Sequence, residues 1–94
     1  MFVYSIKNKK TGKEFIGGYI GSNTKVGVLL KHYKQKLNKE LHKDLQKEGM
    51  TAFNVTILYQ TNDLKTLEDM EEFYILKRNT IEKGYNTDTG YRLL

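Results

Sequence analysis

The sequence predicts a small domain of the α/β type, more narrowly α+β, with a three-stranded antiparallel sheet flanked by three helices. Segments with strand-like alternation and segments with helical spacing follow one another in the order strand, strand, helix, helix, strand, helix. Neither a linker nor an internal repeat interrupts the 94 residues. We therefore expect residues 1–94 to form a single domain.

The N-terminal segment predicts a β-hairpin. Residues 2–6 alternate and are rich in strand formers, residues 8–13 have the composition of a turn, and a second strand begins at Glu14. This second strand contains three glycines, Gly17, Gly18 and Gly21. Glycine in a strand permits a bulge or lets another group approach the backbone closely.

Two helices follow the hairpin. Residues 22–24 offer N-cap side chains, and the apolar residues after them have helical spacing: Val26, Val28, Leu29, Leu30, Tyr33 and Leu37. A second helix is expected to begin at Asn38 and to stop at Gly49, with Leu41 and Leu45 turned inward.

A third strand and a third helix complete the domain. Residues 52–59 alternate and predict a half-buried strand with one apolar face, made of Phe53, Val55, Ile57 and Tyr59. Residues 66–69 resemble a helix N-terminus, and the helix after them is expected to run to about Arg78. The tail from Gly84 onward has an irregular composition, with a short strand as an option.

Composition excludes several classes of protein. The chain has no cysteine, which rules out disulfides and thiolate zinc sites. No apolar run approaches the roughly 20 residues of a membrane span, and the N-terminus lacks a signal-peptide layout. We expect a cytoplasmic protein, and the rarity of arginine and absence of proline are typical of AT-rich genomes such as those of a phage or a low-GC bacterium.

The net charge of +5 is unevenly distributed. Eleven lysines against four acidic residues give residues 1–50 a charge of +7, whereas residues 51–94 carry −2. A basic half indicates a polyanionic partner, with phosphate the usual candidate. The alternative is a solvated lysine-rich surface without a partner.

Four short motifs in a fixed order resemble the GIY-YIG nuclease family. They are Phe2-Val3-Tyr4, Phe15-Ile16-Gly17, a helix carrying Glu71-Glu72-Phe73-Tyr74-Ile75, and Gly84-Tyr85-Asn86. The resemblance implies the fold already predicted. It also implies a metal-dependent endonuclease or phosphodiesterase that acts on nucleic acid with Mg²⁺ or Mn²⁺.

The resemblance also implies roles for single residues. Tyr4 would help to activate the attacking water, Glu71 would hold the metal, and Asn86 would tie backbone segments together beside the site. Glu72 is a rival to Glu71, but it projects about 100° away around the helix.

The second motif leaves two alternatives open. Phe15 occupies the position of the family's second tyrosine and has no hydroxyl, while Gly17 ends that motif. Tyr19-Ile20-Gly21 spells the motif four residues later, and Tyr19 would serve if the strand carried a longer bulge or hairpin.

The family's arginine is not matched. Alignment on His32 puts Val28 in its place, and a count from Gly17 puts Lys25 there. Lys25 or Lys31 could bring a charge to the phosphate, with Lys34 on the same basic stretch, but lysine lacks the planar fork of arginine. His32 is a candidate for proton transfer, although a histidine on a basic helix is more often a surface residue.

The functional hypotheses therefore differ in class. The first is a working nuclease with a degenerate catalytic set, using a cleft lined by Tyr4, Phe15, Tyr19, Lys25, His32, Glu71 and Asn86. The second is an inactive module that binds nucleic acid or a small nucleotide signal. The third is an inhibitor that binds protein, and a homodimer or a protein partner also remains open.

Overall fold

The computed structural model describes residues 1–87 and confirms the predicted α+β class. Its antiparallel sheet contains β1 (Phe2–Asn8), β2 (Glu14–Tyr19) and β3 (Phe53–Gln60), in the order β2-β1-β3. β1 is buried along nearly its whole length because it lies between the other two strands and under helices on both faces. Within residues 1–87, no helix combines the length and apolarity that a membrane span requires.

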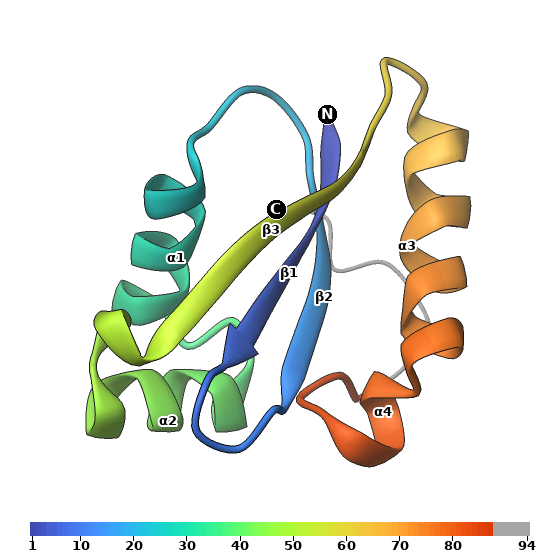
Figure 1. Cartoon of the computed structure of the whole chain (residues 1–94). Helices are drawn as coiled ribbons and strands as arrows, with labels where there is room; N and C mark the ends of the chain where they lie inside the picture. Colours follow the sequence, from blue (N-terminus) through green and yellow to red (C-terminus); the bar gives the residue numbers. More distant parts are fainter. Residues whose placement is uncertain (88–94) are drawn as a thin grey trace.

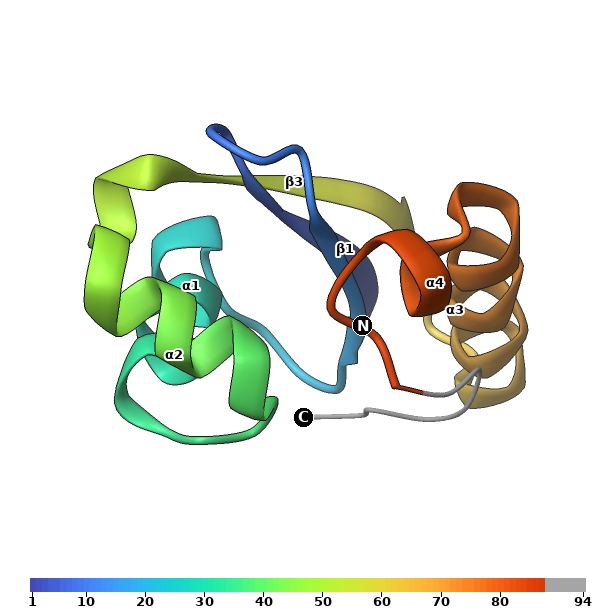
Figure 2. The same cartoon turned by 90° about the horizontal axis from the view of Figure 1, so that it is seen from below.

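Helices cover both faces of the sheet (Figures 1 and 2). α1 (Lys25–Lys34) and α2 (Lys39–Glu48) lie on one face, whereas α3 (Leu64–Arg78) and the short α4 (Thr80–Lys83) lie on the other. A 3₁₀ turn, η1 (Met50–Ala52), leads into β3. The sequence predicts neither η1 nor α4, because each is too short for an apolar period to appear.

Strand alternation divides the core into two clusters, one for each layer of helices. The cluster under α1 and α2 contains Phe2, Tyr4, Ile6, Phe15, Val28, Leu29, Leu41, Leu45, Phe53 and Tyr85. The cluster under α3 contains Val3, Ile16, Leu67 and Ile75. Polar side chains are also buried in both layers of helices, and these include His32 of α1 and Glu71 of α3.

The helix caps confirm two predictions and correct a third. Thr24 caps α1 by accepting a hydrogen bond from Gly27 N at 2.9 Å, and Asn38 caps α2. The predicted start of α3 is wrong, because Asp63 is its N-cap and accepts from Thr66 N at 2.8 Å. Thr66 therefore lies inside the first turn. Aspartate is among the best N-cap residues, so α3 begins at Leu64.

Three apolar residues also depart from prediction. Val26 is 67% exposed although it has the spacing of the core face, and Leu37 lies beyond the end of α1. In β3 the pairing with β1 shifts, so that Tyr4 lies opposite Ile57 but Val3 lies opposite Tyr59. This bulge turns Leu58 toward the α3 layer and leaves Tyr59 exposed, which breaks the predicted alternation.

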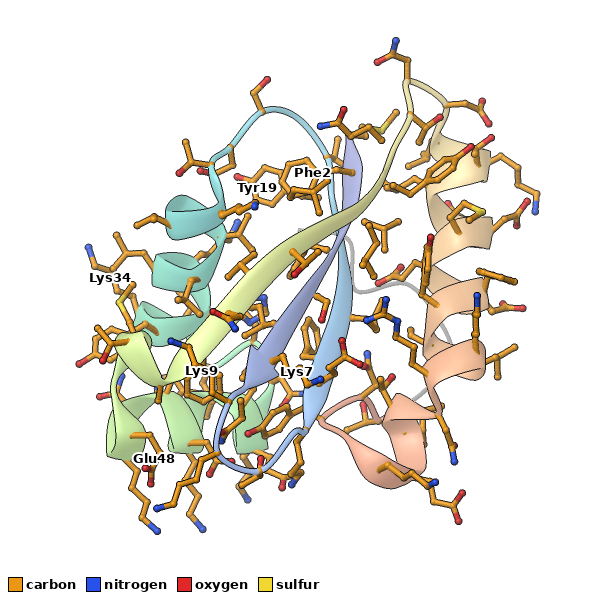
Figure 3. All side chains as sticks on the ribbon, viewed as in Figure 1. Phe2, Lys7, Lys9, Tyr19, Lys34 and Glu48 are labelled. Carbon is orange, nitrogen blue, oxygen red and sulfur yellow. The ribbon has the colours of Figure 1, made fainter. Side chains whose placement is uncertain are left out.

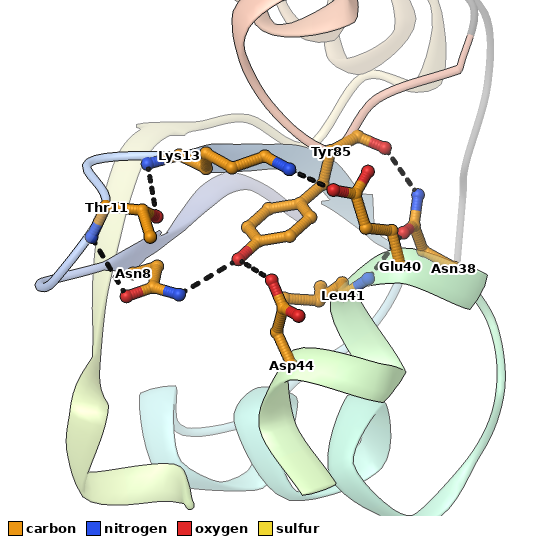
Figure 4. Close-up of polar contacts among 8 residues, drawn as sticks. All are labelled: Asn8, Thr11, Lys13, Asn38, Glu40, Leu41, Asp44 and Tyr85. Atoms are coloured by element: carbon orange, nitrogen blue, oxygen red, sulfur yellow. Dashed lines mark hydrogen bonds and ion pairs between the residues drawn. The ribbon is translucent and has the colours of Figure 1, made fainter. Parts of the chain in front are cut away.

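The segment after α4 returns to the outer edge of β2 and is anchored by Tyr85 (Figure 4). The Tyr85 hydroxyl accepts a hydrogen bond from Asn8 Nδ2 at 3.1 Å and donates one to Asp44 at 2.7 Å. Its backbone N–H donates to Glu14 O at 2.8 Å, and its carbonyl accepts from Asn38 Nδ2 at 2.7 Å. The segment is therefore held to the hairpin, to β2 and to α2 at once.

Candidate active site

A buried hydrogen bond joins Tyr4 of β1 to His32 of α1. Tyr4 Oη and His32 Nε2 are 2.7 Å apart, and the two side chains are 0% and 1% exposed. Burial raises the pKa of the Tyr4 hydroxyl well above its usual value, and the nearby Glu71 raises it further. Burial, together with the charge of Lys31, lowers the pKa of His32 to about 4. Both groups are therefore neutral at pH 7, and the interpretation of His32 as a surface residue is wrong.

Gly17 makes room for this pair. It lies directly opposite Tyr4 in the β1–β2 register, so both residues face the α1 layer. A Cβ on Gly17 would lie only 2.5 Å from Tyr4 Oη and 2.8 Å from Phe15 Cε2. Phe15 completes the pocket, with its ring 5.0 Å from that of His32 and tilted by 61°. Phe15 thus contributes packing where a tyrosine would have contributed a hydroxyl.

Glu71 approaches from the other layer of helices. It is fully buried on α3, one turn from both Leu67 and Ile75, whereas Glu72 is only half-buried. Glu71 therefore occupies the helix face that packs on the sheet. Its charge raises the Tyr4 pKa although Tyr4 faces the opposite layer. The two groups therefore interact electrostatically from opposite faces of the sheet.

Asn86 binds the outer edge of β2 as a neighbouring strand would. Its Oδ1 accepts from Ile16 N and its Nδ2 donates to Ile16 O, both at 2.9 Å. Gly84 lets the chain come this close, because a Cβ there would clash with Glu14 O and Thr80 O. The Asn86 side chain is buried beside the second motif.

Tyr19 does not meet the condition for the alternative motif. The pairing of β1 with β2 runs from Phe2–Tyr19 to Lys7–Glu14 without a shift, so β2 contains no bulge. Tyr19 instead stacks on Phe2, with ring centroids 5.5 Å apart and planes 11° apart (Figure 3). Lys31 Nζ lies 5.5 Å from the Tyr19 ring centre, which makes a cation–π contact.

The candidate basic residues of α1 do not share one exposed stripe with His32. Val28 and His32 are buried in the core, whereas Lys25 is exposed and Lys31 is half-buried over Tyr19. Lys34 lies on the outer side of α1, away from Tyr19 (Figure 3). Val28 therefore packs where the alignment puts the arginine and offers no charge.

In residues 1–87, most of the residues expected to line a cleft have little or no exposed surface. These are Tyr4, Phe15, His32, Glu71 and Asn86, each at 4% exposure or less. Tyr4, Phe15 and His32 pack together on the α1 side of the sheet, whereas Glu71 lies on α3 on the other side and Asn86 binds the edge of β2. Sequence reasoning placed Tyr85 in a motif and Asn38 at a helix start, but it did not predict that these two residues anchor the chain beside Asn86. The adjacency of Tyr85 to Asn86 was the available signal.

Comparison with known proteins gives a match of fold. No protein-family model matches the sequence, and no curated protein matches it. Two solved structures are similar. One is a mutant of the catalytic domain of the intron endonuclease I-TevI, with a TM-score of 0.74, 21% identity, and coverage of 95% of this chain and 94% of that chain. The other is the catalytic domain of the homing endonuclease I-TevI, with a TM-score of 0.72, 23% identity, and coverage of 93% and 97%.

I-TevI is a GIY-YIG homing endonuclease, so the resemblance expected from the four motifs is confirmed for the fold. TM-scores of this size establish the fold, while identities this low leave the activity to be argued from the chemistry of the site.

Proposed function

We propose that this chain, which has the GIY-YIG fold of the I-TevI catalytic domain, is a slow nuclease that hydrolyses phosphodiester bonds of nucleic acid. The observation that carries the proposal is the buried hydrogen-bonded pair Tyr4–His32, with the buried Glu71 close enough for its charge to raise the Tyr4 pKa. Buried polar groups lower stability unless they are compensated, and apolar side chains would pack there at less cost. Perturbed pKa values at such a cluster favour a functional site.

Tyr4 and His32 would move the proton of the attacking water. His32 is neutral, so in the tautomer with its proton on Nδ1 the Nε2 atom accepts a hydrogen bond from the Tyr4 hydroxyl. Tyr4 can then take a proton from water while passing its own to His32, and no phenolate accumulates. The low pKa of His32 makes it a weak base, which limits the rate.

The proposed site offers few protein ligands to a divalent cation, but their chemistry fits. Glu71 is a carboxylate, the ligand type that Mg²⁺ and Mn²⁺ prefer. Within residues 1–87, no group of three His, Asp or Glu side chains is placed to hold a metal. Mg²⁺ commonly binds through one or two carboxylates and keeps several waters, so Glu71 would be the protein ligand. When bound, the cation supplies stabilisation of charge on the scissile phosphate.

The substitutions in the motifs support a low rate. Val28 and Phe15 replace two polar groups, and each is buried against the site. Loss of a single transition-state donor typically costs about two to three orders of magnitude in rate. The half-buried Lys31 is a cation of α1 whose charge acts on His32, and as a point charge it replaces arginine incompletely.

The basic half of the chain supports nucleic acid as the partner. Lys25, Lys31 and Lys34 all lie on α1, the helix that contributes His32. Binding through lysines of this kind is weak, independent of sequence and sensitive to salt. A nucleic-acid substrate is consistent with a cytoplasmic location, in a bacterial host if the chain is encoded by a phage.

The test is cleavage by matched variants. Purified protein is incubated with supercoiled plasmid, single-stranded DNA, RNA or cyclic dinucleotides, in Mg²⁺, Mn²⁺ or EDTA. We expect slow, metal-dependent cleavage that disappears in Glu71→Gln and persists in Glu72→Gln, since only Glu71 faces the sheet. Equal activity of these two variants, or activity in EDTA, would refute the proposal.

The burial of the cluster favours a second candidate, a module that binds nucleic acid without cutting it. Tyr4 and Glu71 have no exposed surface with which to reach a phosphate. This candidate predicts no cleavage in any metal and unchanged affinity in Glu71→Gln. Replacing Lys25, Lys31 and Lys34 with glutamine would weaken binding and reduce the slope of log affinity against log salt by about 0.9 for each lost duplex contact.

A further inference from the structure

β3 forms an edge of the sheet that no described element pairs with. In the order β2-β1-β3 it has one neighbour, and the helices lie to either side of the sheet without crossing its outer margin (Figure 2). Its sequence, FNVTILYQ, contains neither a charged residue nor a proline. Natural edge strands commonly carry lysine or proline to prevent pairing with another chain. β3 has neither lysine nor proline, and its bulge, at Leu58, lies outside residues 53–57.

The hydrogen bonds of the sheet determine which groups β3 presents. Asn86 binds the N–H and C=O of Ile16 from outside β2, so Ile16 points away from β1 and its partner Ser5 points toward β3. Ser5 lies opposite Thr56, so Thr56 and Asn54 bond to β1. By alternation, the backbone groups that point outward belong to Phe53, Val55 and Ile57.

These three residues make β3 complementary to itself. If a second β3 lies antiparallel with Val55 opposite Val55, then Phe53 lies opposite Ile57, and Asn54 lies opposite Thr56. The hydrogen-bonded pairs are all apolar and either β-branched or aromatic, which are favourable cross-strand pairs. The pairs on the other face are polar and uncharged. We propose that β3 is a dimer interface, at which it pairs with β3 of a second copy of this chain.

The surface beside β3 also fits a second copy of this chain. A hollow of about 180 Å³ lies beside β3 and is lined by Lys25, Val26, Leu29, Phe53, Asn54 and Val55. The partner's Ile57, opposite Phe53, would lie over this hollow. Val26, which is otherwise 67% exposed, would then have an apolar neighbour. Lys25 of each copy would lie on the same side of the joined sheet, so added salt would strengthen the association.

The test is sedimentation equilibrium over a wide range of protein concentration. We expect the mass to rise from the 11.0 kDa of the monomer toward twice that value. Asn54→Lys/Thr56→Lys would set lysine opposite lysine in both symmetric pairs and weaken the dimer at least about tenfold. Asn54→Glu/Thr56→Glu would do the same, and a mixture of the two variants would form the dimer again. Both side chains are exposed, and circular dichroism would verify that each variant is folded.

The matched control is Phe73→Lys/Leu76→Lys, on the outer face of α3, where both residues are exposed. This variant should dimerise as the wild type does. The proposal is overturned if the wild type stays monomeric at every concentration, or if only the α3 variant loses the dimer. It is also overturned if the lysine and glutamate variants of β3 fail to associate when mixed.

Discussion

The burial of His32 should make the stability of the fold depend on pH, and the size of the effect follows from the shift in the pKa of His32. The pKa of His32 is about 4 in the folded chain, against an ordinary value of about 6.5. Between these two pH values, His32 is therefore protonated in the unfolded chain and neutral in the folded chain. Stability is fully present above pH 6.5 and is lost as the pH falls from there toward 4.

The magnitude follows from the two pKa values. Each unit of difference corresponds to about 1.4 kcal/mol, which gives roughly 3 kcal/mol over the whole range. Between pH 7 and about pH 5 the expected loss in the free energy of unfolding is about 2 kcal/mol. Most carboxylates titrate below that range, so the histidine contribution can be isolated there.

The assay is urea denaturation at several pH values, with one variant for each of the two histidines. His32→Gln keeps a side chain that can hydrogen bond to Tyr4 but cannot titrate, and it should flatten the dependence. His42→Gln, on the partly exposed side of α2, should leave the dependence as in the wild type. A wild-type slope that survives in His32→Gln, or disappears in His42→Gln, would refute the assignment.

Further predictions concern the groups around this pair, each measured by urea unfolding. Gly17→Ala should destabilise the fold by about 1–3 kcal/mol, because its Cβ would displace the Tyr4 hydroxyl; an unchanged midpoint would contradict this. Asn86→Ala should cost about 2–4 kcal/mol, because it strips both backbone partners from the buried Ile16, and a loss below 1 kcal/mol would mean that water replaces them. Asn38→Ser should keep the cap of α2 but lose the bond to the Tyr85 carbonyl, and should therefore be more stable than Asn38→Ala by about 1 kcal/mol.

Local chemistry made much of the fold predictable from the sequence. The first cap, Thr24, and the start of α2 at Asn38 depend on side chains that bond to their own neighbours. The strands were found because alternation repeats over several residues. The features that the sequence did not predict depend on contacts between residues far apart in the chain. The bulge that exposes Tyr59 arises from pairing with β1, and its signal lies in neither strand alone.

The candidate site was predictable as a set of residues and not as a geometry. Tyr4 and His32 are separated by 28 positions, and nothing local indicates that one accepts a hydrogen bond from the other. His32 was expected to be a surface residue because it lies on a lysine-rich helix, and Val28 was both an apolar-face residue and the position aligned with the family's arginine. Their burial depends on which face of α1 meets the sheet, which only the packed structure reveals.

The bonds from Asn86 to β2 have a consequence for how copies of this chain can assemble. A sheet that is open along both margins can recruit neighbours without limit, and growth of that kind ends in fibres. Here the backbone of Ile16 is already occupied by a side chain of its own molecule, while the β3 margin stays available. Pairing through β3 can therefore join two copies, and it then uses the β3 edge of both, so a third copy has no β3 edge left to pair with. The segment after α4, through Asn86 and the Tyr85 backbone, thus favours a finite pair over an endless polymer.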